Sequence, residues 1–382
     1  MKSKPSGGIA NAPRGEFASE LFFNLRGNEL TDMFDYLKWR GDIRFSQISL
    51  NPADALIFSA LSYIKCDGLV PENLKNSVTL EEFAELFLTT GDPEKKVRVK
   101  QDLKLLKEAA NSERFSKVKM SNYRNILIAE EETQFAAVTF WMEDGSAFLA
   151  FRGTDSTLTG WKEDFNMSFQ ESVPAQRLAL KYTREFCMVN SIPIYLGGHS
   201  KGGNLAVYAA AKAEKWMQER IRGVFNQDGP GFTDNLMGNP GYQAIVPKIH
   251  TYVPQSSLIG MLLEHEEPYI VIKSNQIGVM QHDPYTWEIM GKDFVHVEEI
   301  TADSRFLNKT IKNWLAGMTR EERDVFVETV FELLAAGTAD HTSEIMHPKN
   351  VYSYFKTLRS DESMRRLLAS ELTNLILAAK KE

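Results

Sequence analysis

The sequence is short of cysteine and has no long apolar run. Its 382 residues include two cysteines, Cys66 and Cys187, too few for a disulfide framework or a four-cysteine zinc site. Cys187 stands among apolar residues of a helix-like stretch, so we expect a buried, reduced thiol and a cytoplasmic location. No stretch reaches the roughly 18 apolar residues that a membrane-spanning helix needs. The N-terminal residues also lack the apolar core of a secretory signal.

Positive charge is not in excess either. Lysine and arginine total 44 against 51 aspartate and glutamate residues, a formal net charge of -7, which disfavours binding to nucleic acid or to an anionic membrane surface. The chain also lacks a Gly-Lys-Ser/Thr phosphate-binding loop and a His-Glu-x-x-His zinc motif. We therefore expect no cofactor, no metal and no nucleic-acid partner. With 43% hydrophobic residues, the composition is typical of a globular protein with a sizeable core.

Changes in residue pattern divide the chain into four parts. Residues 1–18 are rich in Gly, Pro, Ser and Lys, which predicts a flexible lead. Residues 19–116 have helical periodicity, whereas residues 117–300 alternate short apolar strands with helices. Residues 301–382 are helical again. We expect the third part to be the core of the fold, with the helical parts on either side packed against it.

Capping residues predict several helix boundaries. Asn51 precedes a proline and an almost continuous apolar run, which predicts the start of a buried helix. Residues 80–92 predict a shorter amphipathic helix, and residues 93–115 predict one charged helix with a narrow apolar stripe. Nearer the C-terminus, Thr319 and Glu322 have the spacing of a capping box ahead of another helix.

Strand signals begin near residue 117. The pair Asp144-Gly145 predicts a hairpin turn between two strands, and a helix is predicted over 174–189. Short apolar strands that alternate with helices indicate an α/β fold with a mostly parallel central sheet and helices on both faces. The predicted strands after the hairpin are 192–198, 223–229, 248–254 and 269–274.

The sequence Gly-His-Ser-Lys-Gly, residues 198–202, lies between one of these strands and a helix. In this context a Gly-x-Ser-x-Gly motif is typical of a nucleophile elbow, a sharp turn that exposes the serine hydroxyl. Gly198 and Gly202 flank Ser200 where a Cβ atom would collide with the turn. The amide of Lys201 stands at the helix start, which favours developing negative charge. The alternative is a structural glycine turn whose serine has no role.

A second segment, Ala-Phe-Leu-Ala-Phe-Arg-Gly-Thr-Asp, ends an upstream strand at Gly153 and Thr154. In an α/β-hydrolase, the loop after an earlier strand supplies the second amide of the oxyanion hole. Thr154 begins such a loop. Taken alone, this segment is better explained as an ordinary strand-to-loop turn.

Together, the two segments resemble the class 3 (fungal-type) lipase superfamily. That family has a Phe-Arg-Gly-Ser/Thr stretch, then a Trp and an Asp, and later Gly-His-Ser-x-Gly-Gly. The matching residues here are 151–154, Trp161, Asp164 and 198–203. The chain looks closer still to an uncharacterised bacterial, Mbeg-like branch of α/β-hydrolase-type proteins. That likeness covers nearly the whole chain, including Asn-Gln-Asp-Gly-Pro-Gly-Phe and Val-Pro-Gln-Ser-Ser-Leu-Ile-Gly. The resemblance implies an α/β-hydrolase fold with helical N- and C-terminal extensions and a nucleophilic Ser200.

The candidate base is a histidine that follows the serine, as the α/β-hydrolase order requires. His282 lies just beyond the last predicted strand, on a loop that can fold back over the elbow. The class 3 resemblance also implies a histidine before a tryptophan in this region, and Trp287 follows. A surface histidine beside Asp283 is the alternative. We expect His199, the neighbour of the serine, to be structural.

The candidate acid departs from the family pattern. Class 3 lipases take it from an Asn-x-x-Asp-x-Val-Pro setting after the strand that corresponds to 223–229, but this place reads Thr-Tyr-Val-Pro-Gln-Ser-Ser and has no carboxylate. Asp228, at the end of the preceding strand, is a plausible substitute, and an Asp before Gly-Pro is equally well explained as a turn residue. Asp283, Asp164 and Glu264 are further candidates, and a Ser–His dyad without an acid is also open.

An apolar connection, residues 256–268, precedes the loop of His282. The simpler prediction for it is a core-packing helix, and the alternative is the wall or lid of an apolar pocket. Either arrangement favours an acyl or aryl ester over a sugar phosphate as substrate. The side chains assigned to the pocket or lid are Leu258, Ile259, Met261 and Leu262.

The leading hypothesis is a lipase- or esterase-like serine hydrolase that cleaves carboxylic esters. Ser200, His282 and Asp228 would act on a small-molecule acyl ester or a lipid-like substrate, and the amides of Thr154 and Lys201 would hold the oxyanion. A binding or regulatory protein that keeps the fold without catalysis is the first alternative, and the missing acid favours it. A thioesterase, amidase or acyltransferase acting at the same site is the second. The sequence leaves the oligomeric state open.

Overall fold

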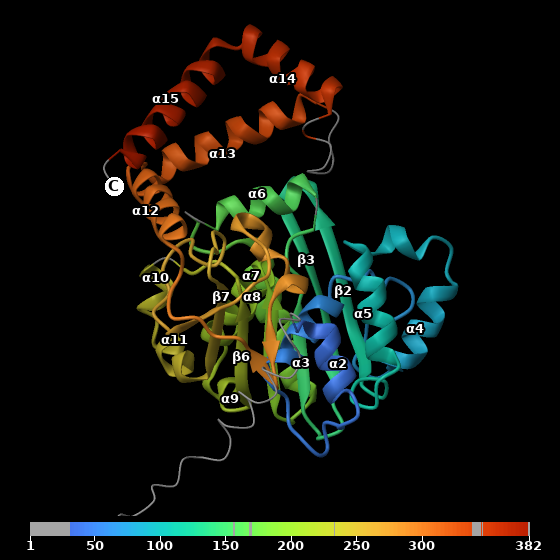
Figure 1. Cartoon of the computed structure of the whole chain (residues 1–382). Coiled ribbons are helices and arrows are strands. Elements are labelled where there is room, and N and C mark those ends of the chain that lie inside the picture. Colours follow the sequence, from blue (N-terminus) through green and yellow to red (C-terminus); the bar gives the residue numbers. More distant parts are fainter. Residues whose placement is uncertain are drawn as a thin grey trace, which may run out of the picture.

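The computed structural model describes residues 31–155, 157–167, 170–232, 234–337, 345 and 347–380. Within these ranges an eight-stranded sheet forms the centre of the molecule, and its strands follow one another in chain order (Figure 1). The predicted lead, residues 1–18, lies outside the described residues. The strands are β1 (Val78–Thr79), β2 (Lys119–Ile128), β3 (Thr133–Trp141), β4 (Ala147–Phe151), β5 (Ile194–His199), β6 (Ile221–Gln227), β7 (Ile249–Pro254) and β8 (Tyr269–Ile272), while β9 (Ile289–Met290) and β10 (Asp293–Phe294) pair separately.

The sheet is antiparallel from β1 to β4 and parallel from β4 to β8. The predicted β3–β4 hairpin is confirmed, and Gly145 in its turn has a φ of 81°, which glycine adopts without strain. The helix predicted over 174–189 is also confirmed. The connections between the parallel strands contain α6 (Leu158–Asn166), α7 (Pro174–Val189), α8 (Lys201–Lys212), α9 (Lys215–Gln218), α10 (Asp234–Met237) and α11 (Pro240–Ile245).

The crossover helices cover one face of the sheet. Right-handed crossovers between parallel strands that follow one another in order all lie on the same side. Accordingly, Tyr182 of α7, Leu205 of α8 and Leu149 of β4 belong to one buried apolar cluster. The opposite face therefore needs other elements to cover it.

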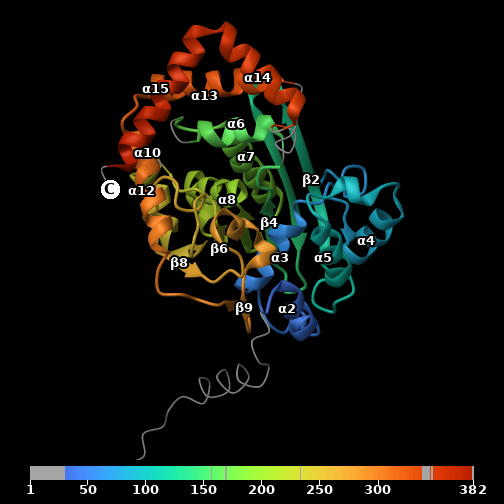
Figure 2. The same cartoon turned by 45° about the horizontal axis from the view of Figure 1, so that its top comes forward.

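Helices from the N-terminal part of the chain cover that opposite face (Figure 2). α3 (Pro52–Leu61) packs directly on the sheet, and α2 (Met33–Arg40) and α5 (Lys100–Ala110) pack against α3, while α4 (Leu80–Thr89) lies beside α5 at the β1 edge. The ring of Phe58 on α3 lies 4.7 Å from the ring of Phe140 and 5.3 Å from that of Phe148, centroid to centroid. Phe148 of β4 faces these helices, whereas its neighbour Leu149 faces the crossover helices. The prediction of an α/β fold with helices on both faces is confirmed.

One predicted helix of this region is wrong. Asn51 caps α3 as expected, but the single helix over 93–115 is divided into the 3-10 turn η1 (Pro93–Lys96) and α5. The carboxylate of Asp102 accepts the amide protons of Arg98 at 2.9 Å and Val99 at 3.0 Å. These bonds hold the preceding residues in an extended conformation and start a new helix. The other 3-10 turns are η2 (Ala129–Glu131), η3 (Val246–Lys248), η4 (Gly278–His282) and η5 (Pro284–Thr286).

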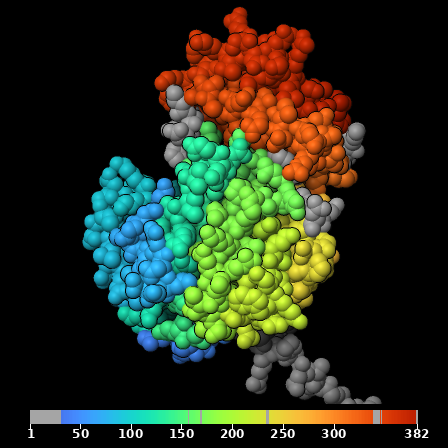
Figure 3. Space-filling view, turned by 180° about the vertical axis from the view of Figure 1, so that it is seen from behind, coloured from blue at the N-terminus to red at the C-terminus, as the bar shows by residue number. Residues whose placement is uncertain are grey.

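The described residues after 300 are helical, as expected, and lie beyond one end of the sheet (Figures 1 and 3). One of their contacts with the core is at α6, where the ammonium of Lys162 lies 2.8 Å from the carboxylate of Glu328. Thr319 and Glu322 form the predicted capping box. None of the helices in the described ranges is long and apolar enough to cross a membrane. The C-terminal helices are α12 (Ala302–Ala316), α13 (Arg320–Ala335), α14 (Pro348–Ser360) and α15 (Glu362–Ala379).

Candidate active site

Ser200 lies at the junction of β5 and α8, where the motif predicts it. Its φ and ψ are 58° and -134°, a strained conformation for a residue other than glycine. A hydrogen bond from its backbone amide to the carbonyl of Gln227 on β6, at 2.9 Å, holds the turn in place. The hydroxyl faces the loop of His282, and the residue is 9% exposed.

Both positions flanking Ser200 require glycine. A Cβ atom on Gly202 would lie 2.1 Å from the carbonyl oxygen of Phe151, and one on Gly198 would lie 2.4 Å from the same oxygen. These distances are far inside van der Waals contact, and a strand carbonyl in a close-packed core cannot move aside. The elbow therefore packs directly on the end of β4, just before Thr154.

The side chains of Ser200, His282 and Asp228 come together at the carboxyl end of the parallel strands. The Nε2 atom of His282 lies 2.9 Å from the Oγ atom of Ser200, and its Nδ1 atom lies 2.6 Å from the Oδ2 atom of Asp228. Since a carboxylate only accepts hydrogen bonds, Nδ1 carries the proton and Nε2 accepts from the serine hydroxyl. In this arrangement the imidazole can take the serine proton while the buried carboxylate stabilises the positive charge that results.

The other carboxylates considered from the sequence make different contacts. Asp283 caps η5. Asp164 lies on α6 and accepts a hydrogen bond from the Thr154 hydroxyl. Glu264 pairs with a lysine of α12 at 2.8 Å. Of these four carboxylates, Asp228 is the one bonded to the imidazole.

His199 supports the loop of His282. Its Nε2 atom lies 2.7 Å from the His282 carbonyl oxygen, and its Nδ1 atom lies 3.0 Å from the Tyr63 hydroxyl. A carbonyl only accepts, so Nε2 carries the proton and Nδ1 accepts from the tyrosine. Burial, reinforced by the neighbouring His282, lowers the pKa of His199 well below its ordinary value and keeps the ring neutral. No sequence signal marked Tyr63.

Helix α5 and a buried indole anchor the segment around His282. The hydroxyl of Tyr285 donates to Asp102 of α5 at 2.7 Å, across 183 positions of the sequence. The indole N–H of Trp287 donates to the carbonyl of Gln281 at 2.8 Å. Tyr285 and Trp287 are both buried. These contacts hold the loop that presents the imidazole to the elbow.

The two segments expected to form the oxyanion hole meet in a polar cluster on α6. Thr154 follows β4 and Lys201 begins α8. The Thr154 hydroxyl donates to Asp164, and the buried ammonium of Lys201 lies 3.1 Å from Glu163. Burial raises the pKa of Asp164 to about 6 despite the nearby ammonium. The cluster fixes α6 against the elbow, while the oxyanion role of the two amides stays a prediction.

The connection over 256–268 is irregular, so the expected core-packing helix is wrong. The amide of Gly260 donates to the hydroxyl of Ser257 at 3.0 Å in a tight turn. Leu263 has a φ of 62°, which an α-helix does not accept. A role in a pocket or lid stays a prediction for the half-buried side chains of Leu258, Ile259, Met261 and Leu262.

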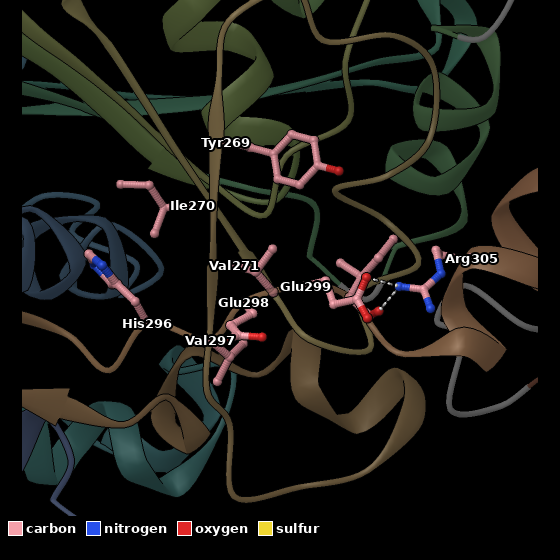
Figure 4. A pocket seen from close by; sticks show the side chains of 9 residues that line it. Tyr269, Ile270, Val271, His296, Val297, Glu298, Glu299 and Arg305 are labelled. Atoms are coloured by element: carbon pink, nitrogen blue, oxygen red, sulfur yellow. Dashed lines mark hydrogen bonds and ion pairs between the residues drawn. The ribbon is translucent and has the colours of Figure 1, made fainter.

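A pocket of about 510 Å³ lies along the edge strand β8 (Figure 4). Tyr269, Val271 and residues 296–300 line it, and the Glu299 carboxylate lies 2.8 Å from the guanidinium of Arg305 at one end. None of its lining residues belongs to the Ser200 site. In the part of the chain that the structure describes, no group of three or more His, Cys, Asp or Glu side chains is arranged to hold a metal ion.

A comparison with models of known protein families identifies the family of this chain. A family model described as Mbeg1-like matches residues 109–332, more than half of the sequence. This chain belongs to the Mbeg1-like family. The matched range of the Mbeg1-like protein runs from the end of α5 into α13 and contains Ser200, Asp228 and His282.

Two solved structures resemble parts of this Mbeg1-like protein. The native Rhizomucor miehei lipase propeptide complex is 16% identical, and the match covers 57% of this chain and 67% of that one with a TM-score of 0.34. A mutant form of MDLA from Penicillium cyclopium is 13% identical, and the match covers 64% of this chain and 83% of that one with a TM-score of 0.36. Both scores are low, so the fold assignment rests on the strand order and packing described above. A search of curated proteins finds no match.

Proposed function

We propose that this protein is a serine hydrolase that cleaves carboxylic esters. The observation that carries the proposal is the pair of hydrogen bonds made by His282, at 2.9 Å to Ser200 and at 2.6 Å to Asp228. A nucleophile, a base and an orienting acid in this order are what acyl transfer requires. Membership of the Mbeg1-like family is compatible with this reaction but does not name one.

The proposed reaction has two halves. In the first, the Oγ atom of Ser200 attacks the acyl carbonyl while Nε2 of His282 takes the hydroxyl proton. The amides of Thr154 and Lys201 stabilise the oxyanion. The bond to the alcohol then breaks, and His282 gives its proton to the leaving alkoxide. In the second half, His282 deprotonates a water molecule that attacks the acyl-enzyme, which releases the carboxylic acid and restores the Ser200 hydroxyl.

The surroundings of the site favour an apolar acyl group. The loop just before His282 carries three exposed apolar side chains, Ile277 at 82%, Val279 at 63% and Met280 at 61%. Apolar groups exposed beside a catalytic site are typical of a surface that contacts an apolar ligand. The half-buried apolar side chains of residues 258–262 are the candidate inner wall. We therefore propose a lipid-like ester or another ester with an extended acyl chain.

The state of the two cysteines indicates in which cellular compartment the protein works. Cys66 and Cys187 are both free and buried, and burial raises the pKa of the Cys187 thiol to about 11. Free thiols are typical of proteins in a reducing environment. We propose a cytoplasmic location on this basis.

Hydrolysis of p-nitrophenyl esters with acyl chains of increasing length tests the proposal. We expect the wild type to turn over, and Ser200→Ala and His282→Ala each to lose roughly 10³-fold or more in kcat. His296→Ala is the matched control, because this exposed histidine lies outside the site and pairs with Asp293 at 3.7 Å. Matching thioesters and anilides then distinguish an esterase from a thioesterase or an amidase. Turnover that survives Ser200→Ala contradicts the mechanism, and a folded wild type inactive on every substrate favours a binding protein.

A further inference from the structure

Ser257 lies in the turn that follows β7, three residues after Pro254, and its side chain contacts the candidate acid Asp228. Its Oγ atom donates to the Oδ1 atom of Asp228 at 2.5 Å, and the other carboxylate oxygen bonds to His282 at 2.6 Å. Ser257 is 3% exposed and Asp228 is fully buried, so water does not compete for these bonds. Each oxygen of the carboxylate therefore has its own protein donor.

The neighbouring glycine fixes the direction of this hydrogen bond. The amide of Gly260 donates to Ser257 Oγ at 3.0 Å, which directs the serine proton towards Asp228. Gly260 also approaches the carboxylate closely, because a Cβ atom on it would lie 2.2 Å from Asp228 Oδ1. The Ser257–Gly260 turn thus closes over the outer side of the acid.

Both ends of this turn are anchored to other elements. The carbonyl of Ser257 accepts from the Ser304 hydroxyl of α12 at 2.5 Å. The carbonyl of Gly260 accepts from Nε2 of His265 at 2.7 Å, and Nδ1 of His265 lies 3.0 Å from the Glu267 carboxylate. Burial opposes the charge of Glu267, but its hydrogen bonds, chiefly with His265, outweigh burial and lower its pKa. The turn is therefore held rigidly behind Asp228.

We propose that Ser257 is a positioning residue that orients the Asp228 carboxylate towards His282. The inference rests on the proposed function, because that function makes Asp228 the acid. The serine belongs to the turn after β7 and holds a carboxylate that is supplied by the end of β6. Without the hydroxyl, Oδ1 of Asp228 is left buried without its side-chain donor, and the carboxylate can rotate away from the imidazole.

Kinetics of Ser257→Ala test this role. We expect kcat to fall about 10- to 100-fold, the range for losing a hydrogen bond to a charged group, while KM changes by less than about twofold. In an Asp228→Ala background the same substitution should cost less than about twofold, because the positioned group is gone. Ser256→Ala is the matched control, since its hydroxyl lies at the surface, 3.2 Å from Thr301, and it should retain the wild-type kcat.

Several kinetic results would overturn the positioning role. One is a wild-type kcat in Ser257→Ala, and another is a loss of the same size with and without Asp228. If Ser257→Ala does not fold, Ser257→Cys replaces it, because a thiol is close in size and a weak donor. A smaller loss in kcat at unchanged KM is then expected, and a wild-type kcat in that variant also rejects the inference.

A measurement without substrate separates this inference from the proposed function. The low-field proton resonance of His282 Nδ1–H, assigned by its loss in His282→Ala, reports the bond to Asp228 directly. We expect Ser257→Ala to move it upfield and speed its exchange with water, and Ser256→Ala to leave it unchanged. An unchanged resonance in Ser257→Ala, or no resonance in the wild type, rejects the inference even if esters are hydrolysed. A shifted resonance in a protein that hydrolyses no ester supports the positioning of Asp228 and rejects the esterase.

Discussion

The Nδ1 atom of His282 lies 2.6 Å from the Oδ2 atom of Asp228, although 54 positions of the sequence separate the two residues. Asp228 comes directly after β6 with a φ of 56°, and His282 ends η4 beyond β8. The carboxylate therefore reaches the imidazole from the end of β6, and Ser257 bonds to it from the turn after β7. Under the proposed function Asp228 is the acid, and it lies at the end of β6 rather than on β7.

This placement predicts different effects for two neighbouring carboxylates. Asp228→Asn should lower kcat by about 10²- to 10⁴-fold, because an amide no longer stabilises the imidazolium or its tautomer as a carboxylate does. Asp283→Asn, which weakens a cap of η5 and an ion pair with Arg98 at 3.7 Å, should change kcat by less than about twofold. Ester kinetics of the two variants, with thermal unfolding to verify folding, check this. Equal losses in both would contradict the assignment of Asp228.

The tight elbow predicts that an added methyl group at Gly202 is not tolerated. Gly202→Ala should reduce the free energy of unfolding by about 3 kcal/mol or more, since its Cβ would meet the Phe151 carbonyl oxygen of β4. Gly91→Ala is the control, because nothing lies within 4 Å of its added Cβ. That variant should stay within about 0.5 kcal/mol of the wild type. Denaturant unfolding measures both, and similar stabilities in the two variants would show that the elbow is looser than described.

The neutral His199 predicts a component of acid destabilisation. Its pKa in the folded protein lies well below the ordinary value of 6.5, so below about pH 6.5 the unfolded chain binds a proton that the folded protein does not. The contribution of His199 to stability is therefore complete above that pH and is lost as the pH falls. The stability difference between wild type and His199→Gln should shrink by up to about 1.4 kcal/mol per pH unit between pH 6.5 and 5. Denaturant unfolding at both pH values tests this, and a constant difference would mean that His199 titrates normally.

The parts of the site built from neighbouring residues could be predicted from the sequence. The elbow depends on Gly198, Ser200 and Gly202 within one turn, and the steric demands of that turn are local. His282 could be predicted from the order of strands, because the loop after the last strand can fold back over the elbow. Asp228 could be predicted as one candidate for the acid but not preferred over the others. An aspartate before Gly-Pro is equally well explained as a turn residue.

Contacts between distant segments could not be predicted. Tyr63 meets His199 across 136 positions and Tyr285 meets Asp102 across 183, and no periodicity encodes such pairs. The connection over 256–268 illustrates a second limit. Its apolar composition predicts burial but not conformation, and the hydrogen bond between Ser257 and the Gly260 amide favours an irregular turn over a helix.

Labelling with a fluorophosphonate probe, followed by mass spectrometry of the modified peptide, tests the central claim most directly. We predict that the wild-type protein is modified at Ser200, that Ser200→Ala is not modified, and that His282→Ala reacts far more slowly because its serine has lost the base. Modification at another residue would contradict the assignment of the nucleophile. The absence of modification in a folded wild type, with and without detergent, would contradict an activated serine altogether.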